Sequence, residues 1–245
     1  MTAEELKTKQ DNFSKTIRSN AEKHGLIKQK PFLEPIYDGV ADIDGYLESN
    51  PKIMWLLKEP YDDLTPAGKP KGGGWSIIND IFNNTDWSDF WKSSTMWQLM
   101  IQINYAIHNS CDWKDLKYIA EKPEMADELK KTAYINLSKM PADSTSSDTH
   151  LWNCFPMWKS IVLEQINLYE PDVIIFGNTF AFFSDILKIE DNPIHTISGH
   201  WGVDAYKKNN MIFIDAYHPA QKGGEDGGYD YVTSIIAAYR KALIK

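Results

Sequence analysis

Four apolar runs in this chain each end on side chains that could do chemistry. These side chains are Glu59 with Tyr61, Asn136, Asn178 and His218. A side-chain amide both donates and accepts hydrogen bonds, and a neutral imidazole offers one donor nitrogen. If the four runs are parallel strands, their carboxyl ends lie along one edge of a sheet, which is where open α/β sheets bind ligands. The pattern therefore predicts a single site at that edge.

The first run, IMWLLKEPYDD from Ile53 to Asp63, shows how such a side chain is placed. Its uninterrupted apolar residues are typical of a strand buried on both faces of a parallel sheet. Pro60 cannot donate to a strand ladder and disfavours helical geometry at Glu59, so the strand ends there. Taken alone, these residues are more typical of a buried strand that ends in a solvated polar turn than of a site.

The other elements follow from apolar spacing and from Gly and Pro positions. Further strands are expected over 133–137 (AYINL), 171–179 (PDVIIFGNT) and 210–217 (NMIFIDAY), with a short extended segment over 194–198. Helices are expected over 3–24, after Ala41, and over 75–82, 95–107, 112–131 with a break near Pro123, 152–169 with Pro156 near its start, 180–187 and 231–244. The glycine-rich stretch 64–74 could be a mobile lid or plain slack.

Alternating strands and helices predict an α/β fold with three layers, α/β/α, around a central, mostly parallel four-stranded sheet. We expect one domain over residues 1–245, with residues 1–50 as an N-terminal helical extension packed on it.

Composition narrows the class of protein. The formal net charge of −8 argues against a general nucleic-acid coat protein, although a local basic patch remains compatible with it. The two cysteines, Cys111 and Cys154, are too few for a disulfide framework or a cysteine-held metal centre. We expect no cofactor and no metal.

The sequence has no apolar signal region and no run of membrane-spanning length, so we expect a cytoplasmic protein without a membrane partner. Its oligomeric state is not set by these features.

Four motifs at the strand ends carry a resemblance to a known family. KEPYD, INL, PDVIIFGNT and HPA occur in this order between about residue 52 and residue 240 and together resemble the uracil-DNA glycosylase superfamily. The resemblance implies a uracil-DNA glycosylase-like fold and a hydrolase of base-excision DNA repair. Its substrate would be single- or double-stranded DNA, in which it cleaves the N-glycosidic bond of a flipped-out uracil or related base.

The resemblance also implies residue roles. Glu59 would position the attacking water or steady the cationic sugar, as a carboxylate does in other glycosidic chemistry. His218 would hydrogen-bond the departing base. Tyr61 would pack beside the base, and Asn136 would read its Watson–Crick edge. A flipped base needs an aromatic face, which Trp75 could supply, and Asn178 would add a substrate contact. Ordinary structural interpretations, as turn or core residues, exist for each.

Three departures from the family pattern leave alternatives open. Leu57 stands where the family usually has glycine, Asp62 stands where a histidine often follows the tyrosine, and the last motif reads HPAQKGG. The chain could instead be a non-catalytic relative that binds a nucleobase, a nucleotide or a nucleic-acid end. In a third alternative, the pocket is filled by its own side chains and the protein acts through partners.

Several lysines fall in or beside the loops at the same predicted edge. They are Lys58, Lys69, Lys71, Lys139 and Lys222, and together they predict local contact with a DNA backbone. Asp62, Asp63 and Asp143 in the same loops oppose this prediction.

Overall fold

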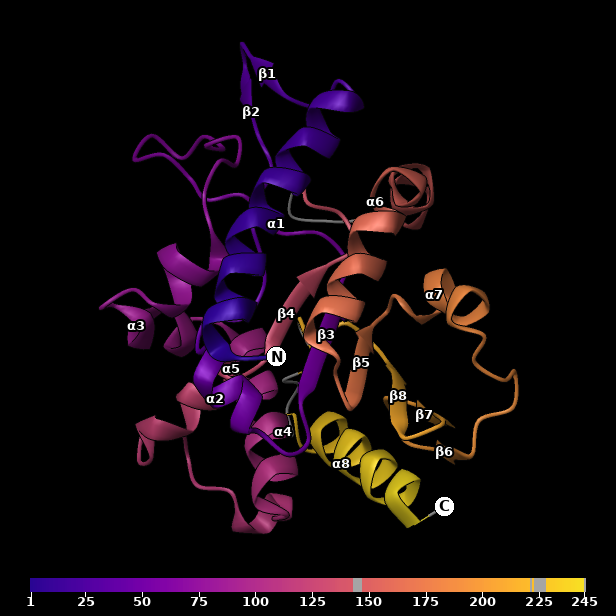
Figure 1. Cartoon of the computed structure of the whole chain (residues 1–245). Coiled ribbons are helices and arrows are strands. Elements are labelled where there is room, and N and C mark those ends of the chain that lie inside the picture. Colours follow the sequence, from indigo (N-terminus) through magenta and orange to yellow (C-terminus); the bar gives the residue numbers. More distant parts are fainter. Residues whose placement is uncertain (143–146, 221, 223–227, 245) are drawn as a thin grey trace.

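The computed structural model describes residues 1–142, 147–220, 222 and 228–244 and has an α/β fold (Figure 1). Its central sheet is mostly parallel, with the strand order β4-β3-β5-β8-β7-β6, and is flanked by helices. The strands are β3 (Ile53–Leu57), β4 (Ala133–Asn136), β5 (Val173–Gly177), β6 (His195–Ile197), β7 (Val203–Lys208) and β8 (Met211–Ala216), and a small separate hairpin contains β1 (Lys28–Gln29) and β2 (Phe32–Leu33).

The prediction of a four-stranded sheet is wrong, because the sheet has six strands among the described residues. The four expected strands are present and parallel to one another. The additional strands β7 and β6 are antiparallel. A two-residue turn, Asn209–Asn210, joins β7 to β8, and a connection this short allows only antiparallel pairing. Asn209 adopts a φ of 54°, which asparagine tolerates better than most residues.

The parallel strands are apolar throughout because both faces of the sheet are covered. All five residues of β3 and all five of β5 are buried. Alternate residues enter different cores: Trp55 and Leu57 belong to one apolar cluster, and Met54 and Leu56 belong to the other. This two-sided burial is the physical reason for the continuous apolar runs in the sequence.

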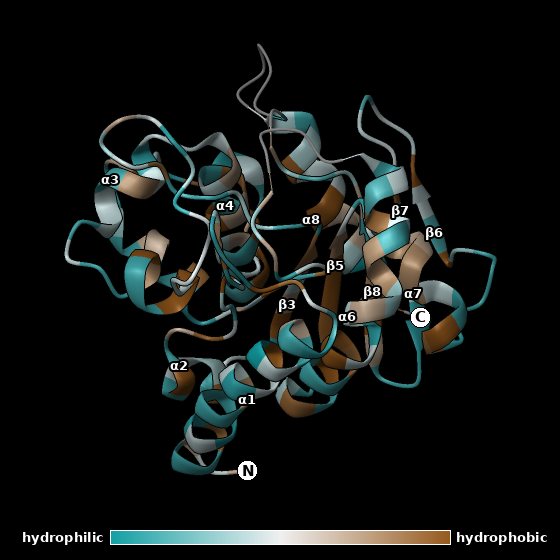
Figure 2. Ribbon diagram, turned by 90° about the horizontal axis from the view of Figure 1, so that it is seen from above, coloured by the Kyte–Doolittle hydropathy of each residue, from teal (hydrophilic) through white to brown (hydrophobic). Residues whose placement is uncertain are grey.

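Helices of the two cores lie on opposite sides of the sheet, as Figure 2 shows from above. Buried residues of α4 (Thr95–Asn109) and α8 (Tyr229–Ile244) belong to the first core. Those of α1 (Ala3–Lys23), α2 (Ile43–Glu48), α6 (Asp148–Tyr169) and α7 (Phe180–Leu187) belong to the second. Helix α1 packs against α6, so the N-terminal segment forms part of the layer on that face.

Some helix boundaries differ from expectation. Helix α6 begins at Asp148, capped by the Ser147 side chain, so Pro156 lies inside the helix rather than near its start. A short helix, α3 (Trp87–Lys92), was not expected. The segment over 75–82 forms a π-helical turn over Ile77–Phe82. The expected helix over 112–131 is reduced to 3-10 turns over Trp113–Asp115 and Pro123–Ala126 and to α5 (Asp127–Lys130).

The glycine-rich stretch before Trp75 is held against the β2 segment. The N–H of Glu34 donates to the carbonyl of Gly72 at 2.7 Å, and the N–H of Gly74 donates to the carbonyl of Pro35 at 3.0 Å. A Cβ at Gly72 would lie 2.0 Å from the carbonyl oxygen of Phe32, and Gly72 has a φ of 90°. Glycine is therefore required at position 72 by close backbone approach.

Two features named from the sequence lie outside the described residues, namely Asp143 and the residues of the HPAQKGG motif at 221, 223 and 224. In the part of the chain that the structure describes, no helix combines the length and apolar character needed to cross a membrane.

A carboxyl pair at the β7–β8 hairpin makes stability depend on pH. Asp215 lies directly opposite Asp204, and burial together with the charge of Asp204 raises the pKa of Asp215 to about 6. The native state therefore holds this proton more tightly than the unfolded chain does, and stability from this group is lost as pH rises through about 6.

We expect Asp215→Asn to raise the free energy of unfolding by roughly 1–2 kcal/mol at pH 8, after allowance for solvent screening, and by much less at pH 4. Urea denaturation at both pH values measures this difference. A stabilisation that is equal at pH 4 and pH 8 would contradict the assignment.

Candidate active site

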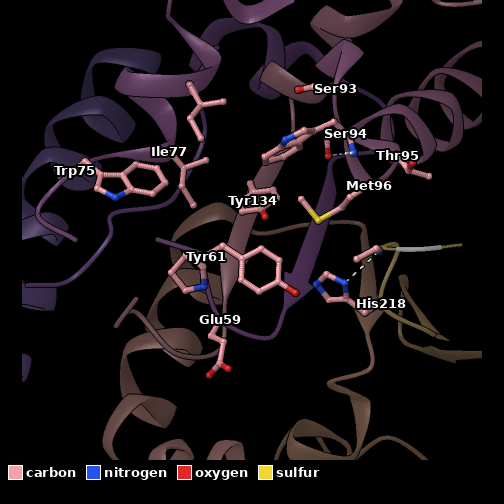
Figure 3. Close-up of a pocket in the computed structure, with 14 residues that line it drawn as sticks. Glu59, Tyr61, Trp75, Ile77, Ser93, Ser94, Thr95, Met96, Tyr134 and His218 are labelled. Atoms are coloured by element: carbon pink, nitrogen blue, oxygen red, sulfur yellow. Dashed lines mark hydrogen bonds between the residues drawn. The ribbon is translucent and has the colours of Figure 1, made fainter. Parts of the chain in front are cut away.

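One cavity of about 430 Å³ lies at the carboxyl ends of the parallel strands and contains four of the side chains expected at a site. Glu59, Tyr61, Trp75 and His218 all line it, and Figure 3 shows Tyr61 and His218 facing the same space. The remaining lining residues are Pro60, Ile77, Ile81, Ser93, Ser94, Thr95, Met96, Trp97, Tyr134 and Ala220. Aromatic rings supply much of the wall, which suits a flat ligand.

The turn after β3 is fixed by backbone hydrogen bonds to the segment that follows β4. The N–H of Leu137 donates to the carbonyl of Leu57 at 2.8 Å, and the N–H of Ser138 donates to that of Lys58 at 3.0 Å. Further along, the N–H of Ala142 donates to the carbonyl of Pro60 at 3.0 Å. These bonds extend the pairing of β3 with β4 beyond the strands and hold Glu59 and Tyr61 at the rim of the cavity.

Gly177, at the end of β5, lets the neighbouring strand ends close over it. A Cβ at this position would lie 2.6 Å from Cδ2 of Leu57 and 3.6 Å from Cα of His218. Strand β5 separates β3 from β8 in the sheet, so a larger residue here would push those two strand ends apart. The Leu57 side chain, which departs from the family pattern, occupies the space that Gly177 leaves.

The imidazole of His218 is neutral, with a defined tautomer. Its Nδ1 accepts a hydrogen bond of 3.2 Å from the N–H of Ala220, so the proton of the neutral ring is on Nε2. Burial, followed by the charges of Lys58 and Lys222, lowers the pKa of His218 to about 4. At neutral pH the ring can therefore donate one hydrogen bond from Nε2 and carries no charge.

The carboxylate of Glu59 is buried at the cavity wall and turns toward α6. In Figure 3 it points away from the His218 imidazole, and its Oε2 lies 3.6 Å from Nε2 of His150 in the first turn of α6. Oε2 has no hydrogen-bond partner among the described residues. A buried carboxylate oxygen without a partner is unfavourable for folding, so its presence calls for a functional explanation.

Asn136 is held rigidly behind the cavity. Its N–H donates to Asp38 at 2.7 Å, and its carbonyl accepts from Nζ of Lys139 at 2.7 Å. Its side chain follows Tyr134 by two residues on β4 and so points to the same face of the sheet as that cavity residue. Both side-chain amide atoms are buried and have no partner among the described residues.

Lys139 does not lie at a surface that DNA could reach, so its assignment to backbone contact is wrong. Its side chain is fully buried, with Nζ 2.7 Å from Oδ2 of Asp38 and 2.7 Å from Oε1 of Gln165. Burial lowers the pKa of Lys139, and the charge of Asp38 opposes this effect. No sequence pattern indicated that Lys139 pairs with Asp38, which lies about a hundred positions away in an irregular segment. Lys139 was therefore expected to be exposed in a loop.

Asn178 is not part of the cavity. It lies at the end of β5 with a φ of 60°, is exposed, and donates its backbone N–H to the carbonyl of Ala216 at 2.7 Å. Its position is explained by the sharp turn into α7, where asparagine tolerates left-handed geometry. The next residue, Thr179, is buried and donates its hydroxyl to the carbonyl of Leu56 at 2.6 Å.

Asp62, another departure from the family pattern, positions Trp75. Its carboxylate accepts from the N–H of Gly73 at 3.1 Å and from Nε1 of Trp75 at 3.4 Å. A negative charge here thus orders the glycine turn and the tryptophan at the cavity wall, rather than opposing a phosphate from an exposed loop.

The other lysines of the predicted basic rim differ in their availability. Lys58 is mostly covered and lies 3.4 Å from the exposed carboxylate of Asp148, whereas Lys71 pairs with Asp63. Lys69 is exposed. Lys222 lies above the ring of Trp201. The charges of Lys58 and Lys222 both lower the pKa of His218, so these two lysines influence the electrostatics of the cavity.

Two parts of the cavity were not found from the sequence. Ser93 ends α3, and Ser94 to Trp97 form the N-cap and first turn of α4, which was expected only as a helix. Tyr134 was expected only as a strand residue. The one available signal in the sequence was Ser94, a favoured N-cap residue that marks the start of this helix. Among the described residues no cluster of His, Cys, Asp or Glu could hold a metal ion.

His218 should titrate with a pKa close to 4 rather than near the ordinary histidine value. Nitrogen-detected NMR of the imidazole should show the Nε2–H tautomer at pH 6. Lys58→Met should raise this pKa because it removes a positive charge, whereas the matched change Lys92→Met on α3 should not. A His218 titration near pH 6.5 in the unaltered protein would contradict this account.

Gly177→Ala should lower the free energy of unfolding by about 1–3 kcal/mol, because its Cβ overpacks the Leu57 side chain. In a Leu57→Val background the colliding Cδ2 is absent, so the same substitution should be less destabilising. Urea denaturation of the four proteins measures this coupling. Equal destabilisation in both backgrounds would show that Leu57 does not limit the space.

Comparison with known proteins does not add a relative to this picture. No protein-family model matches the chain, and no curated protein matches it significantly. The fold and the cavity described above are therefore the basis for any functional assignment.

Proposed function

We propose that this protein hydrolyses the N-glycosidic bond of a uracil or related base extruded from DNA. The observation that carries the proposal is the neutral His218 imidazole, with its proton on Nε2, at the wall of a cavity lined by aromatic rings. A base has flat faces that stack on such rings and carbonyl oxygens that accept such a proton. This proposal extends the resemblance to the uracil-DNA glycosylase superfamily.

Base recognition would combine shape with one amide. Tyr61 and Trp75 border the cavity from loops, and Tyr134 borders it from β4. The amide of Asn136 lies behind the cavity wall, on the same face of β4 as Tyr134, and does not line the cavity. Its donor and acceptor groups would match the edge of a uracil that reached it. Cytosine presents the opposite pattern at that edge, and a buried amide left mispaired would disfavour its binding.

His218 and Glu59 would have different roles in cleaving the bond. The bond between the base and C1′ breaks, and the base leaves with the electron pair. Its developing negative charge is stabilised by the Nε2–H of His218 and by the nearby charges of Lys58 and Lys222. A water oxygen bonds to C1′, and the Glu59 carboxylate steadies the cationic sugar and accepts the proton that the water loses.

One observation favours a second function, binding of a nucleobase without cleavage. The Glu59 carboxylate is directed toward His150 on α6 rather than toward His218. In that case the cavity would serve as a recognition pocket for a nucleobase, nucleotide or nucleic-acid end, and Glu59 would belong to the wall.

Release of uracil from uracil-containing single- and double-stranded DNA distinguishes the two functions. We expect the unaltered protein to release the base, and His218→Ala to slow release by about 10²–10³-fold because a hydrogen bond to the leaving base is lost. Glu59→Gln should slow it by about 10²–10⁴-fold. His24→Ala and Glu190→Gln, at exposed positions outside the cavity, serve as matched controls.

Base binding by the unaltered protein without any release would decide for the recognition pocket. Neither binding nor release, with a folded protein, would contradict both functions.

A further inference from the structure

A second group of aromatic and basic side chains lies near His218, in the segment after β8 and in the turn between β6 and β7. Trp201, in the turn between β6 and β7, meets Tyr217 edge-on with ring centroids 5.6 Å apart. Nζ of Lys222 lies 3.9 Å from the centroid of the Trp201 ring and 5.3 Å from that of Tyr217. We call Trp201, Tyr217 and Lys222 the aromatic shelf.

The aromatic shelf is held in place by α8. The N–H of Trp201 donates to Oδ2 of Asp230 at 2.9 Å, and the Tyr231 hydroxyl donates to the carbonyl of Tyr217 at 2.6 Å. Gly199 allows this approach, since a Cβ there would lie 2.8 Å from Oδ1 of Asp230. The backbones of Trp201 and Tyr217 are therefore held in place before any ligand binds, which limits the conformational entropy lost on binding.

The aromatic shelf is partly open to solvent although it is strongly aromatic. Tyr217 is 47% exposed, and Trp201 is only partly buried against the first core. The sequence places Tyr217 immediately before His218 and Lys222 four residues after it. The Lys222 ammonium lies over the two rings, and burial, followed by the charge of Lys58, lowers the pKa of Lys222. A ring pair with a cation above it is a combination that binds stacked bases and their phosphates.

We propose that the aromatic shelf binds the nucleotide next to the extruded base, with its base against Trp201 and Tyr217 and its phosphate at Lys222, and that the preferred substrate is single-stranded DNA. The inference rests on the proposed function of the cavity. In a duplex the neighbouring base remains stacked and paired, so it cannot reach a shelf at the side of the cavity, whereas in a single strand it turns freely. Local cations at this position also allow a chain with a net charge of −8 to bind a phosphate.

The test compares a nucleoside with a strand. Binding of deoxyuridine reports on the cavity alone, and binding of a five-nucleotide DNA strand with one central 2′-fluoro-deoxyuridine, which resists cleavage, reports on the cavity and the aromatic shelf together. Trp201→Ala should weaken strand binding about tenfold, the range expected for one stacked base, and should leave deoxyuridine binding unchanged. Lys222→Met should reduce the salt dependence of strand binding.

Tyr118→Ala and Lys92→Met are matched controls, because Tyr118 is 77% exposed and Lys92 lies above a different tryptophan, Trp91. Both should bind the strand as the unaltered protein does. Strand affinity and salt dependence unchanged in Trp201→Ala and Lys222→Met would overturn the proposal, as would equal affinity of the unaltered protein for the nucleoside and the strand. Strand binding that depends on Trp201, without base release, would support the aromatic shelf even though the cleavage proposal had failed.

Discussion

The close approach of three parallel strand ends at Gly177 is the constraint on which the site depends. The side chains of Glu59 and His218 come from β3 and β8, which β5 separates, and the missing side chain of Gly177 lets Leu57 and His218 pack over its end. Parallel pairing alone brings strand ends to one edge, but it does not make them converge. The glycine turns a shared edge into one wall of a cavity.

The end of β4, behind the cavity, depends on a buried ion pair. Asp38 and Lys139 join an N-terminal segment to the end of β4, with Gln165 of α6 completing their hydrogen bonds. Buried pairs of this kind add little net stability, yet removing one partner strongly destabilises a protein. We interpret the role of the pair as positioning, because Asp38 accepts from the N–H of Asn136 and Lys139 donates to its carbonyl.

The fold could be predicted where burial of a segment requires a recognisable local pattern of apolar residues. The run from Ile53 to Leu57 is apolar because both its faces are covered, so β3 could be read without other information. The hairpin strand β7 includes Asp204, Lys207 and Lys208 and is only partly buried, a weaker pattern that was missed. Lys139 was misplaced for a different reason: its partner is distant in sequence, and no local pattern distinguishes a buried lysine from an exposed one.

The most direct measurement is a crystal structure of the protein with a short single strand that contains an uncleavable 2′-fluoro-deoxyuridine. The account predicts that the uracil lies in the cavity beside Tyr61, with a carbonyl oxygen about 2.8–3.0 Å from Nε2 of His218. A uracil bound elsewhere, or bound in the cavity with its carbonyl oxygens turned away from His218, would contradict the central claim.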